Sequence, residues 1–534
     1  MVIQVLKALL LGLGAFQAVS AESSTYTELY RPQYHFTPPK NWMNDPNGLL
    51  YHKGIYHLFY QYNPGGTTWG AISWGHATSR DLTHWEQQPI ALLARGYPNN
   101  ITEMFFSGSA VADVDNTSGF GHSGKTPLVA MYTSYYPYAQ TLPSGKKVQA
   151  NQQAQSIAYS LDDGTTWTTY DKANPVILDP PAQYSDQILN FRDPNIFWYK
   201  PTKKWIAVLS LAELHKLLIY TSKDLKNWTL ASEFGPVNAV GGVWECPNLF
   251  PMSVDGDDNN VKWFAMIGLN PGGPPGTIGS GTQYVVGNFD GATFTADADN
   301  WGPDFYAAQA YNGLALEKRL AIGWMNNWQY GGLIPTTPWR SAMSIPREFS
   351  LTTINGKATL VQAPTESWGS IMSGKGLDRS FLSVDEGTKS IGSVGKALKI
   401  KLSFSDRDTA AAGLSQFGII VRATPDLKQQ TRVGYDFATK EVFIDRSRSG
   451  NVSFDSTFPD TYHAPLASNA RGQITLQIYV DWSSVEVFGG QGETTISTQI
   501  FPSNGATNAE IFSIGGNTKN VHVEINKIIS TWDN

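Results

Sequence analysis

Cysteine is almost absent from this chain, which has one, Cys246, among 534 residues. A disulfide within the chain is therefore impossible. Without such cross-links the protein must be held together by packed cores and hydrogen-bonded backbone, which favours large domains over small stapled ones. The chain is also too long for one ordinary hydrophobic core, so we expect two domains.

Apolar runs long enough to cross a membrane are missing as well. The apolar stretch at residues 8–16 follows Lys7, precedes small residues at 18–21, and is too short to span a bilayer. This layout is typical of a secretory signal, so residues 1–21 are predicted to be a signal peptide and the mature protein to be secreted, without a membrane as partner. Four Asn-x-Ser/Thr sequons agree with secretion and predict glycosylation. They are Asn100, Asn116, Asn227 and Asn451.

No charge of one sign predominates. The net charge is −6 and the pI about 5.9, and both signs are spread along the chain. This balance argues against nucleic acid or an anionic membrane as a partner. Aromatic residues, in contrast, are plentiful, with 17 Trp, 24 Tyr and 25 Phe. They suit packing in an all-β protein and also suit the apolar faces of sugar rings.

Helical periodicity is scarce, and short β-rich runs separated by Gly, Pro, Asn and Asp turns dominate. One pattern repeats: an Asp turn followed by an aromatic residue. It occurs at residues 79–85, 160–167, 222–228 and, more faintly, 288–294. Intervals of about 60 to 80 residues fit a unit of roughly four strands, the size of a propeller blade.

The repeat predicts an all-β protein made of a five-bladed β-propeller followed by a C-terminal β-sandwich. Four copies and the residues after 300 make five blades within 22–355. Residues 356–372 are expected to be a linker, and alternating strand patterns indicate a β-sandwich over 373–534. The alternative is a sandwich in which the Asp turns recur by coincidence.

Three acidic residues share one local setting although they lie far apart in sequence. Asp45, Asp193 and Glu245 each precede Pro-Asn and an apolar run, with Cys246 intervening in the third case. Proline pushes the residue before it into an extended conformation, so each acid is expected at the entry to a strand. The repeat makes these the first strands of blades one, three and four, which line the central channel. The three carboxyl groups should therefore converge.

Convergent carboxyl groups point to glycoside hydrolysis, in which one protonates the leaving oxygen and another attacks the sugar or activates water. Asp45 is the candidate nucleophile, because Asn44 and Asn47 can hydrogen-bond its carboxylate and keep its pKa low. Glu245 is the candidate acid/base, because its Trp and Cys neighbours offer an apolar setting that favours the protonated form.

Asp193 would be the third acid. With Arg192 beside it, Asp193 should stay ionised and favour an oxocarbenium-like transition state. A metal site is the competing interpretation, but no His pairs at ligand spacing accompany the acids. No motif supplies Cys246 with a His partner, so it is not expected to be a nucleophile. We expect neither a metal nor a cofactor.

The three acid motifs together resemble those of a known family. Residues 42–48, 192–194 and 245–247 resemble the three defining motifs of glycoside hydrolase family 32, the β-fructosidases. The likeness extends over essentially the whole mature chain. Residues 484–488 resemble the family's sandwich signature and are expected to be structural.

The resemblance implies a five-bladed propeller joined to a β-sandwich, and a retaining double displacement. It implies Asp45 as nucleophile, Glu245 as acid/base and Asp193 as transition-state stabiliser. Six further residues resemble those around the terminal fructose, although each alone also fits a structural role: Asn44, Gln61, Trp69, Ser107, Arg192 and Trp339.

Within the family the chain is similar to the fungal secreted exo-inulinases, for example at residues 91–97, 129–136 and 324–330. This similarity implies an exo-acting enzyme that removes terminal β-D-fructose from inulin, with side activity on levan and sucrose. An invertase or a fructosyltransferase would use the same acids, and an endo-acting enzyme would release oligosaccharides. A decayed member could be a non-catalytic fructan-binding protein. A sialidase would need an Arg cluster and a Tyr nucleophile, and no such motif accompanies the acids.

Overall fold

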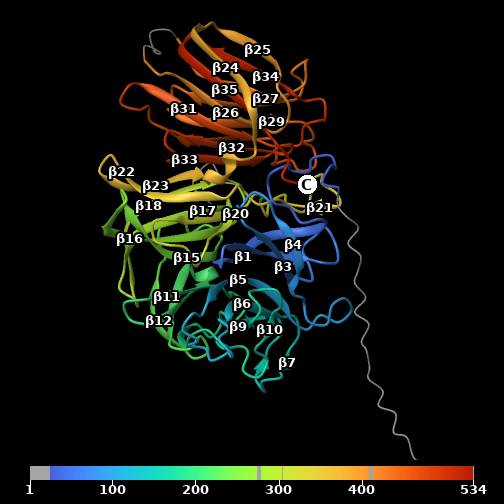
Figure 1. Cartoon of the computed structure of the whole chain (residues 1–534), viewed down its shortest axis with the longest axis vertical. Coiled ribbons are helices and arrows are strands. Elements are labelled where there is room, and N and C mark those ends of the chain that lie inside the picture. The colour runs from blue at the N-terminus through green and yellow to red at the C-terminus, as the bar shows by residue number, and fades with distance from the viewer. Residues whose placement is uncertain (1–24, 273–277, 304, 408–412, 533–534) are drawn as a thin grey trace, which may run out of the picture.

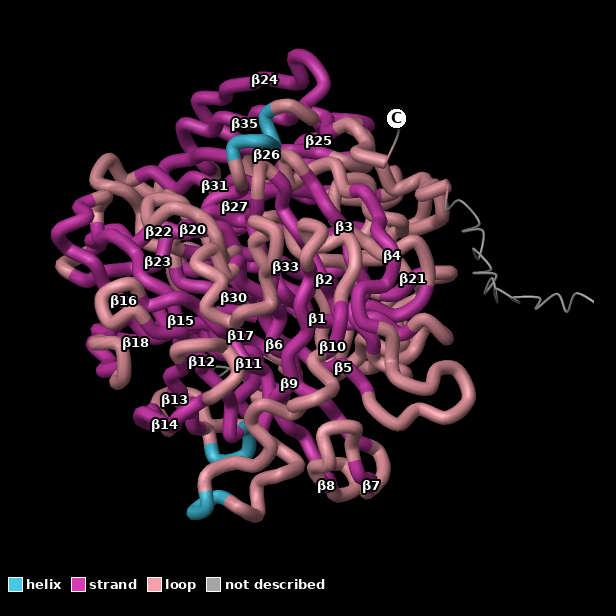
Figure 2. Tube along the Cα trace, turned by 60° about the horizontal axis from the view of Figure 1, so that its bottom comes forward, coloured by secondary structure: helices cyan, strands magenta, loops and turns pink. Residues whose placement is uncertain are grey.

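The protein is described here from a computed structural model covering residues 25–272, 278–303, 305–407 and 413–532. Strands make up nearly all of its regular structure, which confirms the all-β prediction (Figure 2). The described residues contain three short 3-10 helices, η1 (Ala182–Tyr184), η2 (Ala212–Leu214) and η3 (Glu366–Gly369). In this part of the chain no helix has the length and apolarity needed to cross a membrane. The predicted signal peptide, residues 1–21, lies outside the described residues.

The first three sheets follow one another along the chain in the lower part of the molecule (Figure 1). The first sheet has the order β21-β1-β2-β3-β4, with β1 (Asn41–His52), β2 (Ile55–Asn63), β3 (Ser73–Ser79), β4 (Glu86–Leu92) and β21 (Trp339–Arg340). The second has the order β10-β9-β6-β5, with β5 (Met104–Ala112), β6 (Leu128–Tyr136), β9 (Gln152–Ser160) and β10 (Thr168–Thr169). The third has the order β11-β12-β13-β14, with β11 (Phe191–Tyr199), β12 (Lys204–Leu211), β13 (Lys216–Ser222) and β14 (Trp228–Phe234). A small ribbon pairs β7 (Gln140–Thr141) with β8 (Lys147–Val148).

The fourth sheet joins two groups of four antiparallel strands. One group contains β15 (Val243–Val254), β16 (Asp257–Asn270), β17 (Gly281–Phe289) and β18 (Phe294–Pro303). The other contains β19 (Tyr306–Ala310), β20 (Arg319–Trp324), β22 (Arg347–Ile354) and β23 (Lys357–Pro364). A single pair, Val254 with Leu351, connects the two groups. In the third sheet β12 is buried nearly throughout, because its two faces pack into two different cores.

The Asp turns found in the sequence occupy equivalent places in the sheets. Asp81, Asp162, Asp224 and Asp290 lie between the third and fourth strands of their respective sheets. Each carboxylate accepts a backbone N–H from two to four residues further on, at 2.8–2.9 Å. The repeat therefore marks one recurrent hairpin, as such side-chain turns do.

The C-terminal residues form two six-stranded sheets packed over one core (Figure 1). One sheet contains β24 (Met372–Val384), β35 (Thr518–Ile528), β26 (Leu398–Ser405), β31 (Gln473–Val480), β32 (Ser484–Gly489) and β33 (Thr494–Gln499). The other contains β25 (Gly387–Ser393), β34 (Asn508–Ile514), β27 (Gln416–Ala423), β28 (Gln430–Asp436), β29 (Glu441–Arg448) and β30 (Thr461–Pro465). In β26 the alternation of Leu398, Ile400 and Leu402 with lysines buries one face and exposes the other.

The predicted linker, residues 356–372, is partly strand. Residues 357–364 form β23, which pairs antiparallel with β22 along its whole length. Leu360 is buried in the core beside this sheet, so the segment gains a packed face as well as a hydrogen-bonded edge. The connector is therefore shorter than predicted and runs from 365 to 371, through η3.

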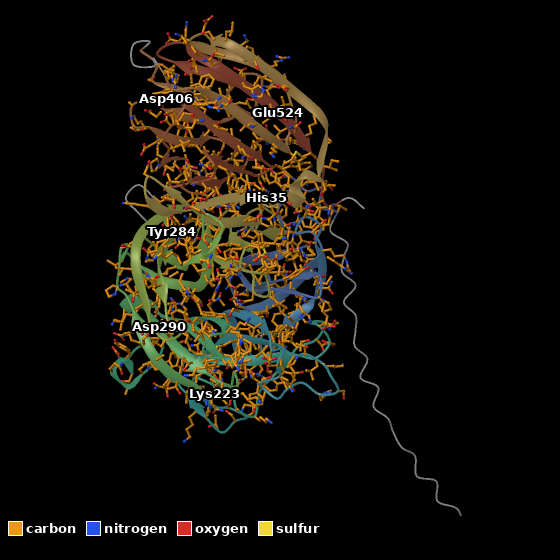
Figure 3. The ribbon with its side chains drawn as sticks, turned by 60° about the vertical axis from the view of Figure 1, so that its left-hand side comes forward. His35, Lys223, Tyr284, Asp290, Asp406 and Glu524 are labelled. Atoms are coloured by element: carbon orange, nitrogen blue, oxygen red, sulfur yellow. The ribbon has the colours of Figure 1, made fainter. Side chains whose placement is uncertain are left out.

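A buried ionic cluster joins the two parts of the molecule, and Figure 3 shows His35 at their junction. His35 Nδ1 lies 2.8 Å from Asp481, and its Nε2 lies 3.0 Å from Glu486. Glu486 also accepts hydrogen bonds from Arg347 and from the backbone N–H of Ile345. Burial alone would lower the pKa of His35, but Asp481 and Glu486 raise it to about 9. Glu486, from the predicted structural signature, thus fastens the C-terminal sheets to the N-terminal ones.

We predict that this cluster makes stability fall as pH rises from about 6.5 to about 9. A histidine with a raised folded pKa contributes stability that is complete below its unfolded pKa, near 6.5, and lost through its folded pKa. The loss should be on the order of 3 kcal/mol. Thermal unfolding of His35→Gln should lose this pH dependence, whereas His122→Gln, at an exposed site, should keep it. Parallel curves for His35→Gln and the parent protein would contradict the assignment.

Candidate active site

Five strands meet around a common centre: β1, β5, β11, β15 and β19. Hydrogen bonds join each strand to the next, and in most of them a backbone N–H donates to a buried side-chain oxygen. Asn47 Oδ1 accepts from Gly108 N at 3.1 Å, Ser109 Oγ from Ile196 N at 2.8 Å, Asn195 Oδ1 from Leu249 N at 3.1 Å, and Asn248 Oδ1 from Ala310 N at 3.0 Å. Backbone bonds of Asn312 with Leu49 and Tyr51 join the segment directly after β19 to β1. The five strands therefore form a closed ring.

The same irregularity occurs on every strand of this ring. Each ring strand pairs with the next strand of its sheet, and at one point it advances three residues while the partner advances two. These one-residue bulges lie between Met43 and Pro46, Phe105 and Gly108, Arg192 and Asn195, Glu245 and Asn248, and Tyr306 and Gln309. A bulge bends its strand and re-aims side chains. Here the bulges lie at or beside all three predicted acids.

Asp45 and Asp193 come together on one side chain, that of Cys246. The thiol lies 3.3 Å from Asp45 Oδ2 and 3.7 Å from Asp193 Oδ2. The backbone N–H of Cys246 donates to Asp193 Oδ2 at 3.0 Å. Ser107 donates to Asp45 Oδ2 at 2.6 Å, and Asp45 is 7 % exposed. The two carboxyl groups, 148 residues apart in sequence, thus share one small buried site.

Glu245 is the most open of the three acids, and it faces two donors. Its side chain is 17 % exposed. Arg192 donates to Glu245 Oε1 through Nε and lies 3.0 Å from the same oxygen through its second terminal nitrogen. Tyr306 donates its hydroxyl to Glu245 Oε2. The prediction of an apolar setting for Glu245 is therefore wrong, because a guanidinium and a phenol bind this carboxyl group.

Burial controls the ionisation of Asp45. It raises the pKa of this carboxyl, and the charge of Glu245 adds to the rise, whereas hydrogen bonds from Ser107, Asn44 and Cys246 oppose it. The prediction of a low pKa for Asp45 is therefore wrong.

One of the expected donors to Asp45 points elsewhere. Asn47 donates to the backbone carbonyl of Asp45 at 3.2 Å and accepts from Gly108. Asn44 alone of the two amides donates to the carboxylate, at 3.1 Å.

The pKa of Asp193 is raised, like that of Asp45. Burial raises its pKa, the charges of Glu245 and Asp45 add to the rise, and Arg192 opposes it only in part. The guanidinium lies 3.9 Å from Asp193 but 3.0 Å from Glu245, so it neutralises mainly the latter. The prediction that Arg192 keeps Asp193 ionised is wrong for this geometric reason. Carboxyl groups this close to one another cannot all ionise cheaply, which adds to the rise in the pKa values of Asp45 and Asp193.

The backbone presents one acid, Asp193, differently from the extended entry that was predicted. Asp193 has φ of +64°, and Cys246, which occupies the same place before proline, has φ of +47°. Such left-handed residues are costly and occur mainly where surrounding structure enforces them. The bulges supply that constraint. They also explain why Cys246, rather than Glu245, aligns with the two aspartates.

The predicted sugar-contacting residues are distributed unevenly around the acids. Gln61 donates to the backbone carbonyl of Phe105 at 3.0 Å and is 3 % exposed. Trp69 is 44 % exposed, with its ring edge-on to Phe106. Trp339 is 1 % exposed, and the guanidinium of Arg31 lies 3.7 Å from its ring. Trp339 is thus a buried ring with a cation over one face, and its role as a sugar contact stays a prediction.

Sequence reasoning missed two residues that contact the acids. Tyr306 carried no motif, and its role depends on β19 lying beside β15 in the ring. Cys246 was considered as a nucleophile and as an apolar neighbour of Glu245, whereas it contacts the other two carboxyl groups. Within the described ranges, no group of three or more His, Cys, Asp or Glu side chains is placed to hold a metal ion.

Comparisons with known protein families give a match in each of the two parts of the chain. Residues 35–364 match the model of the glycosyl hydrolases family 32 N-terminal domain, and residues 371–527 match that of the family's C-terminal domain. The extracellular exo-inulinase of Aspergillus niger is 61 % identical over 526 residues, covering 96 % of this chain and 97 % of that protein.

Two solved structures have the same fold. The exo-inulinase of Aspergillus awamori has a TM-score of 0.92 at 60 % identity, covering 95 % of this chain and all of that one. A β-fructofuranosidase of Schwanniomyces occidentalis, complexed with fructosyl-erythritol, has a TM-score of 0.79 at 31 % identity, covering 96 % and 99 %.

The inter-strand amide bonds yield a testable prediction. Asn195→Ala should leave the buried N–H of Leu249 without a partner, which costs about 1–3 kcal/mol of stability. Its thermal midpoint should fall by several degrees, whereas Asn99→Ala, at an exposed site with no described hydrogen bond, should match the parent protein. Equal midpoints for the two variants would show that the ring does not depend on this bond.

Proposed function

The chain belongs to glycosyl hydrolase family 32, and from this membership we propose that it is a secreted, exo-acting β-fructosidase. It would remove terminal non-reducing β-D-fructofuranosyl residues from inulin, and also act on levan and sucrose. The likeness to an extracellular exo-inulinase over nearly the full length supports this substrate. As a family member the protein is a glycoside hydrolase.

The observation that carries the proposal is the convergence of three carboxyl groups from β1, β11 and β15. Asp45 and Asp193 share one buried site, and Glu245 lies at its more open side, held by Arg192 and Tyr306. Hydrolysis of a glycosidic bond needs a nucleophile inside and a proton donor on the leaving-group side. This arrangement supplies both.

Our assignment of roles follows from this geometry. Asp45 attacks C2 of the terminal fructose while the C2–O bond to the rest of the chain breaks. Glu245 gives its proton to the departing oxygen. In the second step water gives a proton to Glu245 and attacks C2, which frees Asp45. Asp193, held by the N–H of Cys246, would stabilise the positive charge that develops on the ring.

We also propose which of the remaining residues hold the sugar. Asn44 and Ser107 bond Asp45 and so border the attacking oxygen. Arg192 would bind sugar hydroxyls beside Glu245, and Gln61 lies on the wall next to Phe105. Trp69, the exposed aromatic at the rim, would cover the apolar face of the fructose.

The proposed architecture is a five-bladed β-propeller followed by a β-sandwich. The closed ring of five strands supports five blades, with β19, β20, β22 and β23 as the fifth. Its link to the fourth blade is one residue pair, as expected between separate blades. The propeller domain would then extend to Pro364, where the family match also ends, and the sandwich would begin near 372.

Export also remains a proposal for this chain, with residues 1–21 as its signal peptide. All four sequon asparagines are exposed, which suits N-glycans at Asn100, Asn116, Asn227 and Asn451. The name of the A. niger relative, an extracellular enzyme, supports the same conclusion.

The proposal predicts how substitution of the two main acids affects catalysis. Glu245→Gln should lower kcat on inulin about 10²–10⁴-fold, because the leaving oxygen loses its proton donor. Asp45→Asn should lower kcat by orders of magnitude as well. Released fructose is the readout, with Asp385→Asn, an exposed aspartate, as the control. Near-parental turnover in either acid variant would refute the assignment, and oligosaccharides as first products would refute exo action.

A second prediction concerns pH. The hydrogen bond from Ser107 lowers the pKa of Asp45 against the effect of burial, so Ser107→Ala should raise that pKa. Because the nucleophile must be ionised, the acid limb of kcat/KM should move to higher pH. The alkaline limb serves as the internal control and should stay in place. An acid limb that is unmoved, or that moves to lower pH, would show that Asp45 does not set it.

A further inference from the structure

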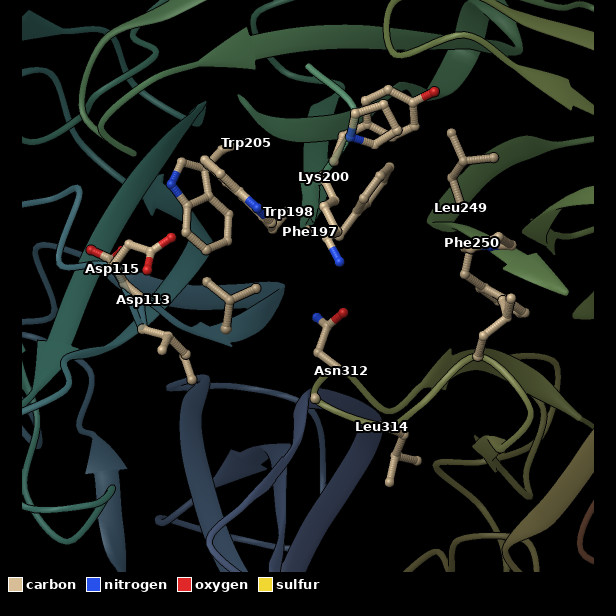
Figure 4. A pocket seen from close by; sticks show the side chains of 18 of the residues that line it. Asp113, Asp115, Phe197, Trp198, Lys200, Trp205, Leu249, Phe250, Asn312 and Leu314 are labelled. Carbon is tan, nitrogen blue, oxygen red and sulfur yellow. The ribbon is translucent and has the colours of Figure 1, made fainter. Parts of the chain in front are cut away.

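The ring of strands has a second opening at the end opposite the acids. A cavity of about 700 Å³ lies there, where β5 and β11 end beside the middle of β15 and the segment after β19 passes close by (Figure 4). This volume lies within the range of about 300–1,000 Å³ of small-molecule sites. None of the three acids, and none of the residues proposed to hold fructose, lines it.

The cavity is separate from the site of the acids. On β11, Trp198 lies five residues beyond Asp193, which at about 3.3 Å per residue corresponds to roughly 16 Å along the strand. Buried groups fill the space between them, including Asn195 and Gln309, which donates to the backbone carbonyl of Gly108. A ligand in this cavity therefore cannot reach the acids through the ring.

Aromatic rings form two of its walls. Phe197 and Tyr199 pack against Trp263, with centroid distances of 5.5 and 5.8 Å. On the other side Trp198 meets Trp205 edge-on at 4.9 Å. All of these except Trp205 are partly exposed, so their faces and edges are available to a ligand.

Polar groups reach into the same space. Figure 4 shows the amine of Lys200 and the amide of Asn312 directed toward its centre. Asn312 donates its amide hydrogens to Ala110 and Ile196, and its Oδ1 accepts no hydrogen bond from any described residue. Arg319 donates through Nε to Pro251, and its terminal nitrogens have no described partner. The cavity thus offers both donors and an acceptor between aromatic walls.

Sugar rings match this combination, because their hydroxyl groups both donate and accept while their ring carbons pack on aromatic faces. We propose that the cavity is a second, non-catalytic binding site for the fructan chain. This inference rests on the proposed function, since it takes the polymeric substrate from there. Occupancy by a second segment or chain of the polymer would raise the effective concentration of fructan ends at the acids. Sucrose, a disaccharide, gains nothing from such a second contact.

The test separates binding at the cavity from catalysis. Calorimetric titration of the Asp45→Asn protein with a purified inulin oligosaccharide should give two sites per chain. Adding Trp198→Ala should leave one site, and adding Lys200→Ala, at an exposed position, should weaken the second site without affecting folding. Trp482→Ala, in the turn between β31 and β32, is the matched aromatic control and should retain two sites.

In the otherwise unaltered enzyme, Trp198→Ala and Lys200→Ala should each raise KM for inulin about threefold or more. Their kcat on inulin and their kcat/KM on sucrose should equal those of the parent protein. One binding site in Asp45→Asn, or unchanged KM in both cavity variants, would overturn this inference alone. A parent protein that hydrolyses neither sugar would overturn the proposed function as well.

Discussion

The structure depends on the buried hydrogen bonds that close the ring of five inner strands. Three of these bonds are accepted by the asparagine that follows an acid motif, from a backbone N–H of the next strand. The three are Asn47, Asn195 and Asn248. Buried backbone groups must be paired, so each bond fixes how far one inner strand lies from its neighbour. Because the acids lie two or three residues before these asparagines, the bonds that close the ring also set the spacing of the carboxyl groups.

The recurrent bulge determines in which direction the side chains of the acid motifs point. One extra residue on each ring strand turns the segment before the asparagine, so that Asp45, Asp193 and Cys246 point toward one site. Glu245 then occupies the place that Arg192 occupies on β11, and the two meet as an ion pair. Burial and mutual repulsion raise the pKa values of Asp45 and Asp193. One backbone device thus accounts for the convergence of the three carboxyl groups and for the burial that raises the pKa values of two of them.

Much of this organisation was accessible from sequence. The all-β class followed from strand-length runs, and the Asp turns marked a real hairpin in each of four successive strand groups. The three acids were identified from the proline and asparagine that follow them. What the sequence could not reveal depends on contacts across the ring: the pairing of Arg192 with Glu245, the hydroxyl of Tyr306, and the packing of Trp339 beneath Arg31. Residues 357–364 were misassigned to the linker because their pairing with β22 has no local signature.

The most direct test of the central claim, a double displacement through Asp45, is the anomer formed when methanol competes with water for the fructosyl group. Attack by Asp45 inverts C2 and attack by methanol inverts it again, so the account predicts methyl β-D-fructofuranoside, identified by NMR. Methyl α-D-fructofuranoside would mean a single displacement and would contradict the role assigned to Asp45.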